Sequence, residues 1–171
     1  MKRLAIAAAL VFAVFAALAA FGASLSPVQR LEASAVSTLD IDTVFDRIDD
    51  LGAHASWSPH LPDGADVSFG TREGEGATLA WSRAGEVGSV EIVQSVAPEL
   101  ARVAVVDAEG ARMLTYALAG EGEGTVIVAT QERELGGPLE RAGAFLRKGG
   151  AQAALEASVE RLAAATPPAA G

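Results

Sequence analysis

Two histidines lie close together in the sequence and are the side chains best suited to acid–base chemistry near neutral pH. His54 and His60 are six positions apart, on either side of Trp57. This spacing does not match a zinc site, and no third ligand is evident in the sequence. The histidines could act as general bases at the mouth of a cavity, but the broken segment that carries them favours exposed loop histidines. We therefore predict no metal site, no cofactor and no assigned catalytic residue.

Three large aromatic side chains could contact a bound molecule. Tyr116 is the only tyrosine, and a buried hydroxyl there needs a partner, either a ligand carbonyl or a backbone or water group. Trp57 and Trp81 are the only tryptophans, and ordinary core packing explains them as readily as ligand lining does. If the chain is an enzyme, its acid or base should be one of the histidines or Tyr116, placed inside the cavity.

The remaining candidate motifs favour structure over chemistry. The carboxylates fall on predicted turns and on the polar face of a helix, where nothing buries them and shifts their pKa. Glu91 and Arg102 are expected on the outer face of a sheet. The glycine clusters at 74–76 and 120–124 lack the strand-to-helix context and the lysine of a phosphate-binding loop, so we predict hairpin turns there. The sequence therefore favours a protein that is not an enzyme.

Composition excludes several classes of function. The net charge is −9, and without Lys2 and Arg3 the chain has eleven cations against 22 acidic residues, a net charge of −11. Such a surface repels phosphate backbones, so we predict no nucleic-acid partner. The absence of cysteine excludes disulfides, thiolate metal sites and a cysteine nucleophile.

Residues 1–23 form an apolar N-terminal segment. Leu4 to Ala23 carries no charge, and twenty helical residues suffice to span a hydrocarbon core about 30 Å thick. The segment is either a signal peptide cleaved after Ala17-Leu18-Ala19 or an uncleaved anchor, and its apolar continuation past that site favours the anchor. We expect a single-pass membrane protein with its domain on the extracytoplasmic side, or a secreted or periplasmic protein after cleavage.

The rest of the chain predicts an ordered series of elements. Residues 24–29 form a linker, a strand follows from Arg30 to Leu39, and a short helix capped by Asp40 or Asp42 runs to Asp50. His54 to Pro62 is a second short helix or turn.

Six runs with a period of two then predict an antiparallel meander with one buried face. Pro138 to Ala165 returns to helical periodicity, with Gly149-Gly150 expected to bend or weaken its middle. Residues 166–171 are expected to form a disordered tail.

This order, with certain local motifs, resembles the SRPBCC superfamily, the START and Bet v 1-like helix-grip domains that include polyketide cyclases. The motifs are Val44-Phe45 with Ile48, Trp57-Ser58-Pro59, Gly74-Glu75-Gly76-Ala77, Gly122 to Thr125 and Leu155 to Leu162. The resemblance implies an α+β fold over residues 30–165, in which a seven-stranded antiparallel sheet wraps around a long C-terminal helix and two short helices follow the first strand. The chain departs from the family at Val128, where tryptophan is common.

The resemblance further implies a cavity between the sheet and the C-terminal helix. A small hydrophobic molecule, lipid-like or isoprenoid-like beside a membrane, is the expected ligand. The residues expected to line the cavity are Trp57, Phe69, Trp81, Ile92, Leu114, Tyr116, Leu139 and Leu146. The alternatives are an enzyme similar to a cyclase or dehydratase, and an envelope interaction module with a collapsed cavity and no ligand.

Overall fold

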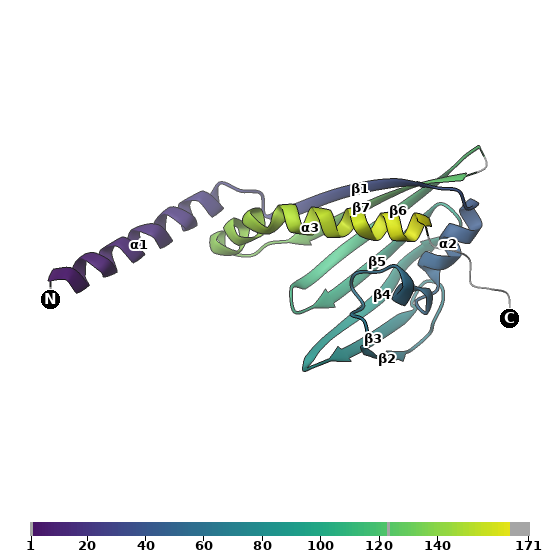
Figure 1. The fold of residues 1–171 in the computed structure, drawn as a ribbon, viewed down its shortest axis with the longest axis horizontal. Helices are drawn as coiled ribbons and strands as arrows, with labels where there is room; N and C mark the ends of the chain where they lie inside the picture. The colour runs from purple at the N-terminus through teal and green to yellow at the C-terminus, as the bar shows by residue number, and fades with distance from the viewer. Residues whose placement is uncertain (1, 123, 165–171) are drawn as a thin grey trace. The chain divides into compact units, whose positions relative to one another are not determined.

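The structure, a computed structural model, describes residues 2–122 and 124–164, with side chains described from residue 13 onward (Figure 1). Three α-helices, one 3₁₀ helix and seven strands follow one another along this part of the chain. In order they are α1 (Lys2–Ala23), β1 (Val28–Ser37), α2 (Ile41–Asp49), η1 (Ala53–Ser56), β2 (Asp66–Phe69), β3 (Thr78–Arg83), β4 (Glu86–Val96), β5 (Leu100–Asp107), β6 (Gly110–Glu121), β7 (Gly124–Glu134) and α3 (Pro138–Ala164).

These elements form two compact units. One contains the residues up to 29 together with residues 134–150, and the other contains residues 30–133 and the chain from 151 onward. The helix α3 therefore contributes to both units, and the boundary falls after Gly150. The helix continues through Gly149-Gly150 without interruption, so the predicted weak point does not end it.

The first unit pairs the end of α1 with the start of α3. The rings of Phe21 and Phe145 meet edge to face at 5.4 Å, and Gln29 Nε2 donates to the carbonyl of Ala144 at 3.1 Å. A Cβ on Gly22 would lie 1.7 Å from the Pro138 carbonyl oxygen, so only glycine permits this approach.

The predicted anchor covers residues 1–23, of which residue 1 and the side chains of 2–12 lie outside the described part. Among the described residues, no helix combines the length and the apolar character needed to cross a bilayer.

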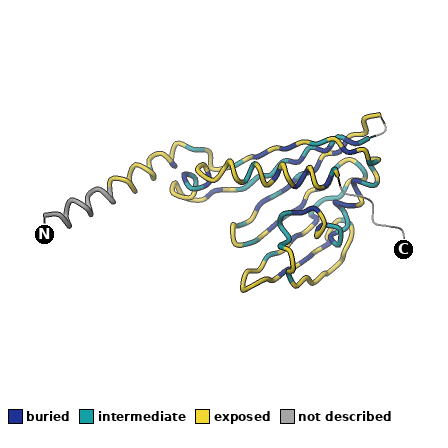
Figure 2. Tube along the Cα trace, viewed as in Figure 1, coloured by how far each residue is buried: buried dark blue, intermediate teal, exposed yellow. Residues whose placement is uncertain are grey.

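The second unit contains one seven-stranded sheet in the order β1-β7-β6-β5-β4-β3-β2, with antiparallel pairing from β2 through β7. Buried and exposed residues alternate along most of its strands (Figure 2), because successive side chains point to opposite faces of a sheet. Glu91 and Arg102 are exposed, as predicted for the outer face. The α+β class and the seven-stranded sheet with a long C-terminal helix are confirmed, although β1 begins at Val28 rather than Arg30.

The short helix α2 closes one end of the core. Asp40 caps it, since its Oδ1 accepts from the Thr43 backbone N–H at 2.9 Å. Its apolar residues recur at spacings of three and four, so that Val44, Phe45 and Ile48 are buried together. Of the two caps that the sequence allowed, Asp40 and Asp42, the structure uses Asp40, and of the predicted apolar face Val44, Phe45 and Ile48 are buried while Ile41 is partly exposed.

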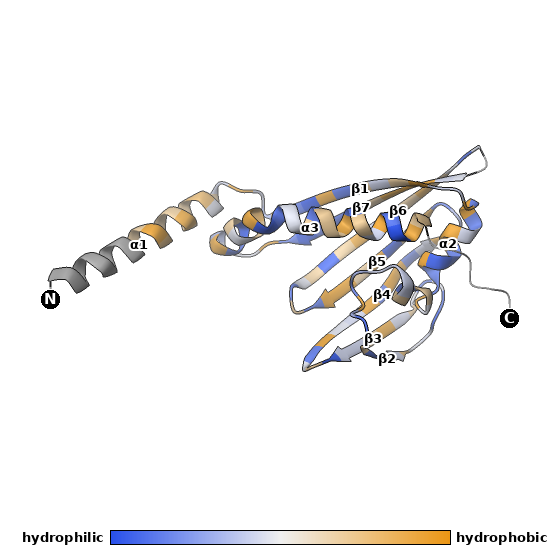
Figure 3. Cartoon of the chain, viewed as in Figure 1, coloured by the Kyte–Doolittle hydropathy of each residue, from blue (hydrophilic) through white to orange (hydrophobic). Residues whose placement is uncertain are grey.

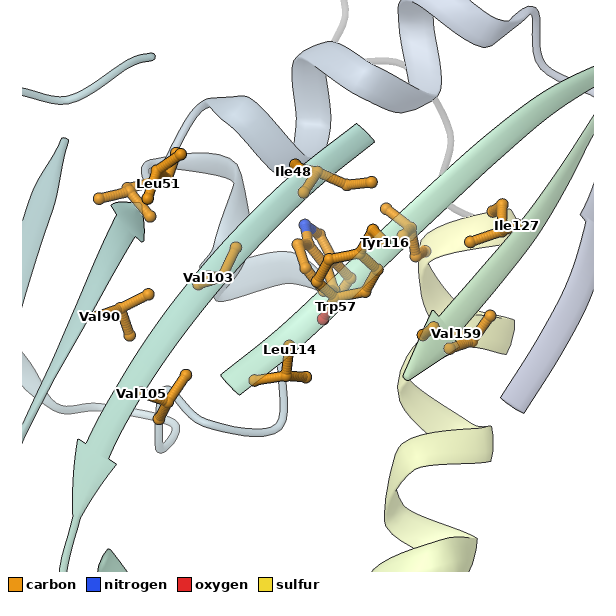
Figure 4. Packing of buried hydrophobic residues seen from close by; sticks show 14 of the residues in the cluster. Ile48, Leu51, Trp57, Val90, Val103, Val105, Leu114, Tyr116, Ile127 and Val159 are labelled. Carbon is orange, nitrogen blue, oxygen red and sulfur yellow. The ribbon is translucent and has the colours of Figure 1, made fainter. Parts of the chain in front are cut away.

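The core forms where the concave face of the sheet meets the C-terminal part of α3. Hydrophobic and hydrophilic residues alternate along the strands (Figure 3), and the hydrophobic set faces Leu155, Val159 and Leu162. At the centre, the rings of Trp57 and Tyr116 meet edge to face at 5.7 Å (Figure 4). A hydrogen bond of 2.8 Å from the Ser37 hydroxyl to the Ala163 carbonyl holds the helix end to β1. The predicted tail at 166–171 lies outside the described residues.

Candidate functional site

The residues predicted to line a ligand cavity lie in different environments. Five belong to the packed core: Trp57, Trp81, Ile92, Leu114 and Tyr116. Three are exposed: Phe69 by 46%, Leu139 by 50% and Leu146 by 74%. Only Trp81 is both buried and on the wall of a pocket described below. Ligand contact by all eight residues stays a prediction.

His54 is not an exposed loop residue, and that prediction is wrong. The side chain is 2% exposed, its Nε2–H donates to the Ile48 carbonyl at 2.8 Å, and its ring lies 4.6 Å from the ring of Trp57. Burial lowers the pKa of His54 to about 4, because a charged imidazolium would lose its hydration there. His54 is therefore a neutral structural residue that ties η1 to the end of α2.

A pocket of about 320 Å³ lies between the sheet and the C-terminal part of α3, entirely within the second unit. Its wall combines an apolar side with a polar side. The apolar side consists of Pro59, Pro62, Ala108, Ala151, Ala154 and Leu155, and the polar side consists of His60, Trp81, Glu86, Asp107, Glu109, Arg112 and Gln131.

Arg112 contacts three other polar residues of the pocket wall, Asp107, Glu109 and His60. Its side chain is 6% exposed, and both terminal nitrogens pair with the Asp107 carboxylate, Nη1 at 3.1 Å from Oδ1 and Nη2 in a shorter contact with Oδ2. Nη1 also donates to Glu109 at 3.4 Å, and Nη2 donates to Nδ1 of His60 at 2.9 Å. A buried guanidinium is stable when it is paired in this way.

The contact with Arg112 fixes the protonation state of His60. Because a guanidinium only donates, Nδ1 of His60 must accept, and the proton of the neutral ring then sits on Nε2. Burial and, to a smaller extent, the adjacent positive charge of Arg112 lower the pKa of His60 to about 3. The Nε2–H of His60, a residue that lines the pocket, is therefore a buried donor without a partner in the protein. The expected exposed loop residue is in fact a fixed hydrogen-bond donor, and its only lone pair is occupied.

Three N–H groups of pocket-lining residues lack a hydrogen-bond partner in the protein. They are Nε2 of His60, Nε1 of Trp81 and Nε of Arg112, and each nitrogen is buried. Most buried polar groups in proteins are paired, and an unpaired one costs about 1–3 kcal/mol. Three such donors around one pocket mark it as the strongest candidate for a ligand site.

The local sequence explains how the Trp81 indole reaches this position. Trp81 on β3 lies opposite Gly88 on β4, and a Cβ at Gly88 would lie 2.5 Å from two indole carbons. Gly88 therefore leaves room for the indole to lie across the neighbouring strand. The glycine was visible in the sequence, but the contact that it permits was not.

Other polar clusters in the described part of the chain offer less chemistry. A second hollow of about 380 Å³ lies beside α2 and is lined by Arg47 and mainly acidic residues such as Asp46 and Glu73. Nε and Nη1 of Arg47 are also buried without a partner in the protein, but both belong to one side chain. Among the described side chains, no group of three histidines or carboxylates is arranged to hold a metal ion.

Neither a protein-family model nor a curated protein sequence matches the chain. Solved structures match it in fold. Protein CV1439 from Chromobacterium violaceum is 16% identical, with a TM-score of 0.57 over 82% of this chain and 99% of the other. A protein from Thermus thermophilus is 22% identical, with a TM-score of 0.53 over 78% of this chain and 94% of the other.

DynU16, a protein in the dynemicin biosynthetic locus, is 17% identical, with a TM-score of 0.55 over 78% of this chain. The match covers 45% of DynU16. At these identities the similarity establishes the fold alone, an antiparallel sheet of the helix-grip kind.

Proposed function

We propose that this chain is a small-molecule-binding protein of the SRPBCC type, and that its ligand occupies the pocket between His60, Trp81, Arg112 and α3. The observation that carries the proposal is that three residues lining one pocket each hold a buried N–H group without a partner in the protein. Concave sites with an apolar wall and a few placed polar groups are the usual form of a small-molecule site.

The dimensions of the pocket limit the ligand. A volume of about 320 Å³ is near the lower end of the range of about 300–1,000 Å³ for small-molecule sites. The apolar wall from Pro59, Pro62 and Leu155 fits a compact hydrophobic body. We therefore propose a compact ligand with a polar end, which narrows the small hydrophobic, lipid-like or isoprenoid-like ligand expected from the sequence.

Native mass spectrometry of the full-length chain, purified gently from cells and followed by organic extraction, tests this function. A stoichiometric small-molecule adduct is the expected result. An empty protein that also fails to take up a fluorescent apolar probe would refute the proposal.

A matched pair of variants connects the adduct to the pocket. Ala154→Trp places an indole in the pocket, whereas Ala153→Trp makes the same change at the exposed neighbouring position on α3, outside the pocket wall. Binding should be lost in the first variant and kept in the second. Equal binding by the two variants would place the ligand elsewhere.

A cyclase-like or dehydratase-like enzyme is the second candidate, and the presence of His60 on the pocket wall favours it. A neutral histidine whose Nε2–H faces a substrate can polarise a carbonyl, but it cannot remove a proton. In such an enzyme the base would have to be a carboxylate, for which Glu109 on the pocket wall is available. A Glu109→Gln variant that keeps ligand affinity and loses turnover of the extracted ligand would support this candidate.

The N-terminal segment carries a separate proposal, namely that residues 1–23 contain an export signal that is cleaved. The sequence around Ala17-Leu18-Ala19 has the small residues that a signal peptidase requires. The intact mass of the protein recovered from cells tests this proposal. Loss of the first 19 to 23 residues would support cleavage, and an intact N-terminus would contradict it.

A further inference from the structure

We propose that the pocket selects uncharged molecules that carry a hydrogen-bond-accepting oxygen, such as a ketone or ester carbonyl, and rejects the corresponding carboxylates. This inference rests on the proposed function and specifies the ligand class of the same pocket. It follows from the direction of the unpaired hydrogen bonds and from the sign of the charges around them.

The unpaired groups are all donors. Indole and guanidinium nitrogens donate and do not accept, and the free nitrogen of His60 carries its proton because Arg112 occupies the other one. A ligand that satisfies them must therefore offer acceptor lone pairs. An alcohol or a carbonyl can do so, whereas an ammonium group has only donors and would leave all three unpaired.

The charges on the wall disfavour an anionic acceptor. Glu86, Asp107 and Glu109 contribute three negative charges, and Arg112 contributes the only positive charge among the lining residues. That positive charge is already paired with Asp107 and Glu109. A carboxylate would enter a site with a formal charge of −2 without a free cation to compensate it, and the whole chain adds to the repulsion with its charge of −9.

The two tryptophans provide a direct readout. Nε1 of Trp57 donates to the Arg47 carbonyl at 3.2 Å, away from the pocket wall, whereas Nε1 of Trp81 has no partner. A ¹⁵N-labelled sample therefore gives two indole N–H resonances, one of which reports on the pocket while the other serves as an internal reference. The variant Trp81→Phe assigns them, because it removes the first.

We would titrate the full-length chain with three probes that share one ring system: naphthalene, 2-acetylnaphthalene and 2-naphthoate. The ketone should bind at least about tenfold more tightly than either of the others, which corresponds to one or two net hydrogen bonds. It should move the Trp81 indole proton downfield and leave the Trp57 resonance in place.

Two variants test which groups provide the selectivity. Trp81→Phe keeps an aromatic ring and removes an N–H, while His60→Asn keeps an acceptor for Arg112 and removes Nε2–H. Each should weaken ketone binding about fivefold to tenfold and change naphthalene binding by less than about twofold. Because Trp81 lies on β3 and His60 in the loop before β2, loss of folding in one variant leaves the other as the test.

The outcomes separate this inference from the proposed function. Equal affinity for naphthalene and the ketone, or tightest binding of 2-naphthoate, would overturn the ligand class while the pocket remains a binding site. No binding of any probe to the folded protein, with both indole resonances unmoved, would overturn the proposed function and the inference together.

Discussion

Lowering the pH from 7 to 5 should destabilise this protein through its two histidines. The folded chain holds the pKa of His54 at about 4 and that of His60 at about 3, whereas an unfolded chain returns both to about 6.5. Below pH 6.5 the unfolded state therefore takes up protons that the folded state does not. The free energy of unfolding must fall as the pH falls through this window, and the loss ends only near pH 3 to 4.

The magnitude follows from the width of the window. Each unit of pH over which only the unfolded state is protonated costs about 1.4 kcal/mol, so the change from pH 7 to 5 should cost about 2 kcal/mol for His54. His60 is only partly buried and should contribute up to the same amount. The pKa values of about 4 and about 3 already include the effects of neighbouring charges. Asp50 raises the pKa of His54, Asp107 raises that of His60, and Arg112 lowers that of His60.

Urea unfolding at pH 7 and pH 5, analysed at a common slope, measures the difference. The variants His54→Gln and His60→Asn, each of which keeps one hydrogen-bonding function, should each remove their share of the pH dependence. Carboxylates titrate mainly below this window and contribute little. A wild-type protein that loses less than about 1 kcal/mol between the two pH values would refute the assignment of both histidines as neutral in the folded protein.

Three further predictions concern stability, measured by urea unfolding at pH 7. Gly88→Ala should cost about 1–3 kcal/mol because the new methyl group meets the Trp81 indole, whereas Gly120→Ala, with open space around it, should change stability by less than about 0.5 kcal/mol; equal effects would contradict the packing argument. Arg112→Met should lower the free energy of unfolding by about 3 kcal/mol, because it leaves the carboxylates of Asp107 and Glu109 without a cation. A loss of under about 1 kcal/mol would show that this ion pair is solvated. Ala84→Asn should stabilise by about 0.5–1 kcal/mol, because this turn residue has φ = 50°, a conformation that asparagine tolerates better; a destabilised variant would contradict the turn geometry.

The sequence predicted the elements of the sheet because their signals are local. A period of two with turn residues between the runs identifies six strands without knowledge of their partners, and the glycines at the turns mark the hairpins. The helix α2 was equally predictable from the sequence, because its cap and its apolar face lie within ten residues. These features depend on spacing along the chain, which the sequence displays directly.

The long helix shows where periodicity is insufficient. Leu139 and Leu146 continue the apolar stripe of α3, yet both are exposed, whereas Leu155, Val159 and Leu162 are buried in the core. The helix spans two compact units, and only its C-terminal part supplies the core of the second. A periodic pattern predicts which residues share a face, but it does not predict how far along the helix a partner surface extends.

The candidate site was hidden because its contacts join distant residues. His60 and Arg112 are 52 positions apart, and neither is informative without the other. From the sequence, a histidine in a proline-containing loop is expected to be exposed. In the fold, Arg112 on β6 contacts His60 and so fixes its tautomer and keeps it neutral. The sequence offered only a weak signal, namely the carboxylates of Asp107 and Glu109 preceding an arginine on a largely apolar strand.

The contrast between the two aromatic centres indicates where function should be sought. Trp57 and Tyr116 pack against each other, and the Trp57 N–H is paired, so this centre of the core is explained by folding alone. Trp81 is also buried, but its N–H has no partner in the protein, and the same holds for one N–H each of His60 and Arg112, which line the same pocket. A leucine or phenylalanine at such positions would avoid a cost of about 1–3 kcal/mol for each unpaired group. Departures from favourable local packing concentrate at functional sites, so these donors point to a ligand that accepts their hydrogen bonds.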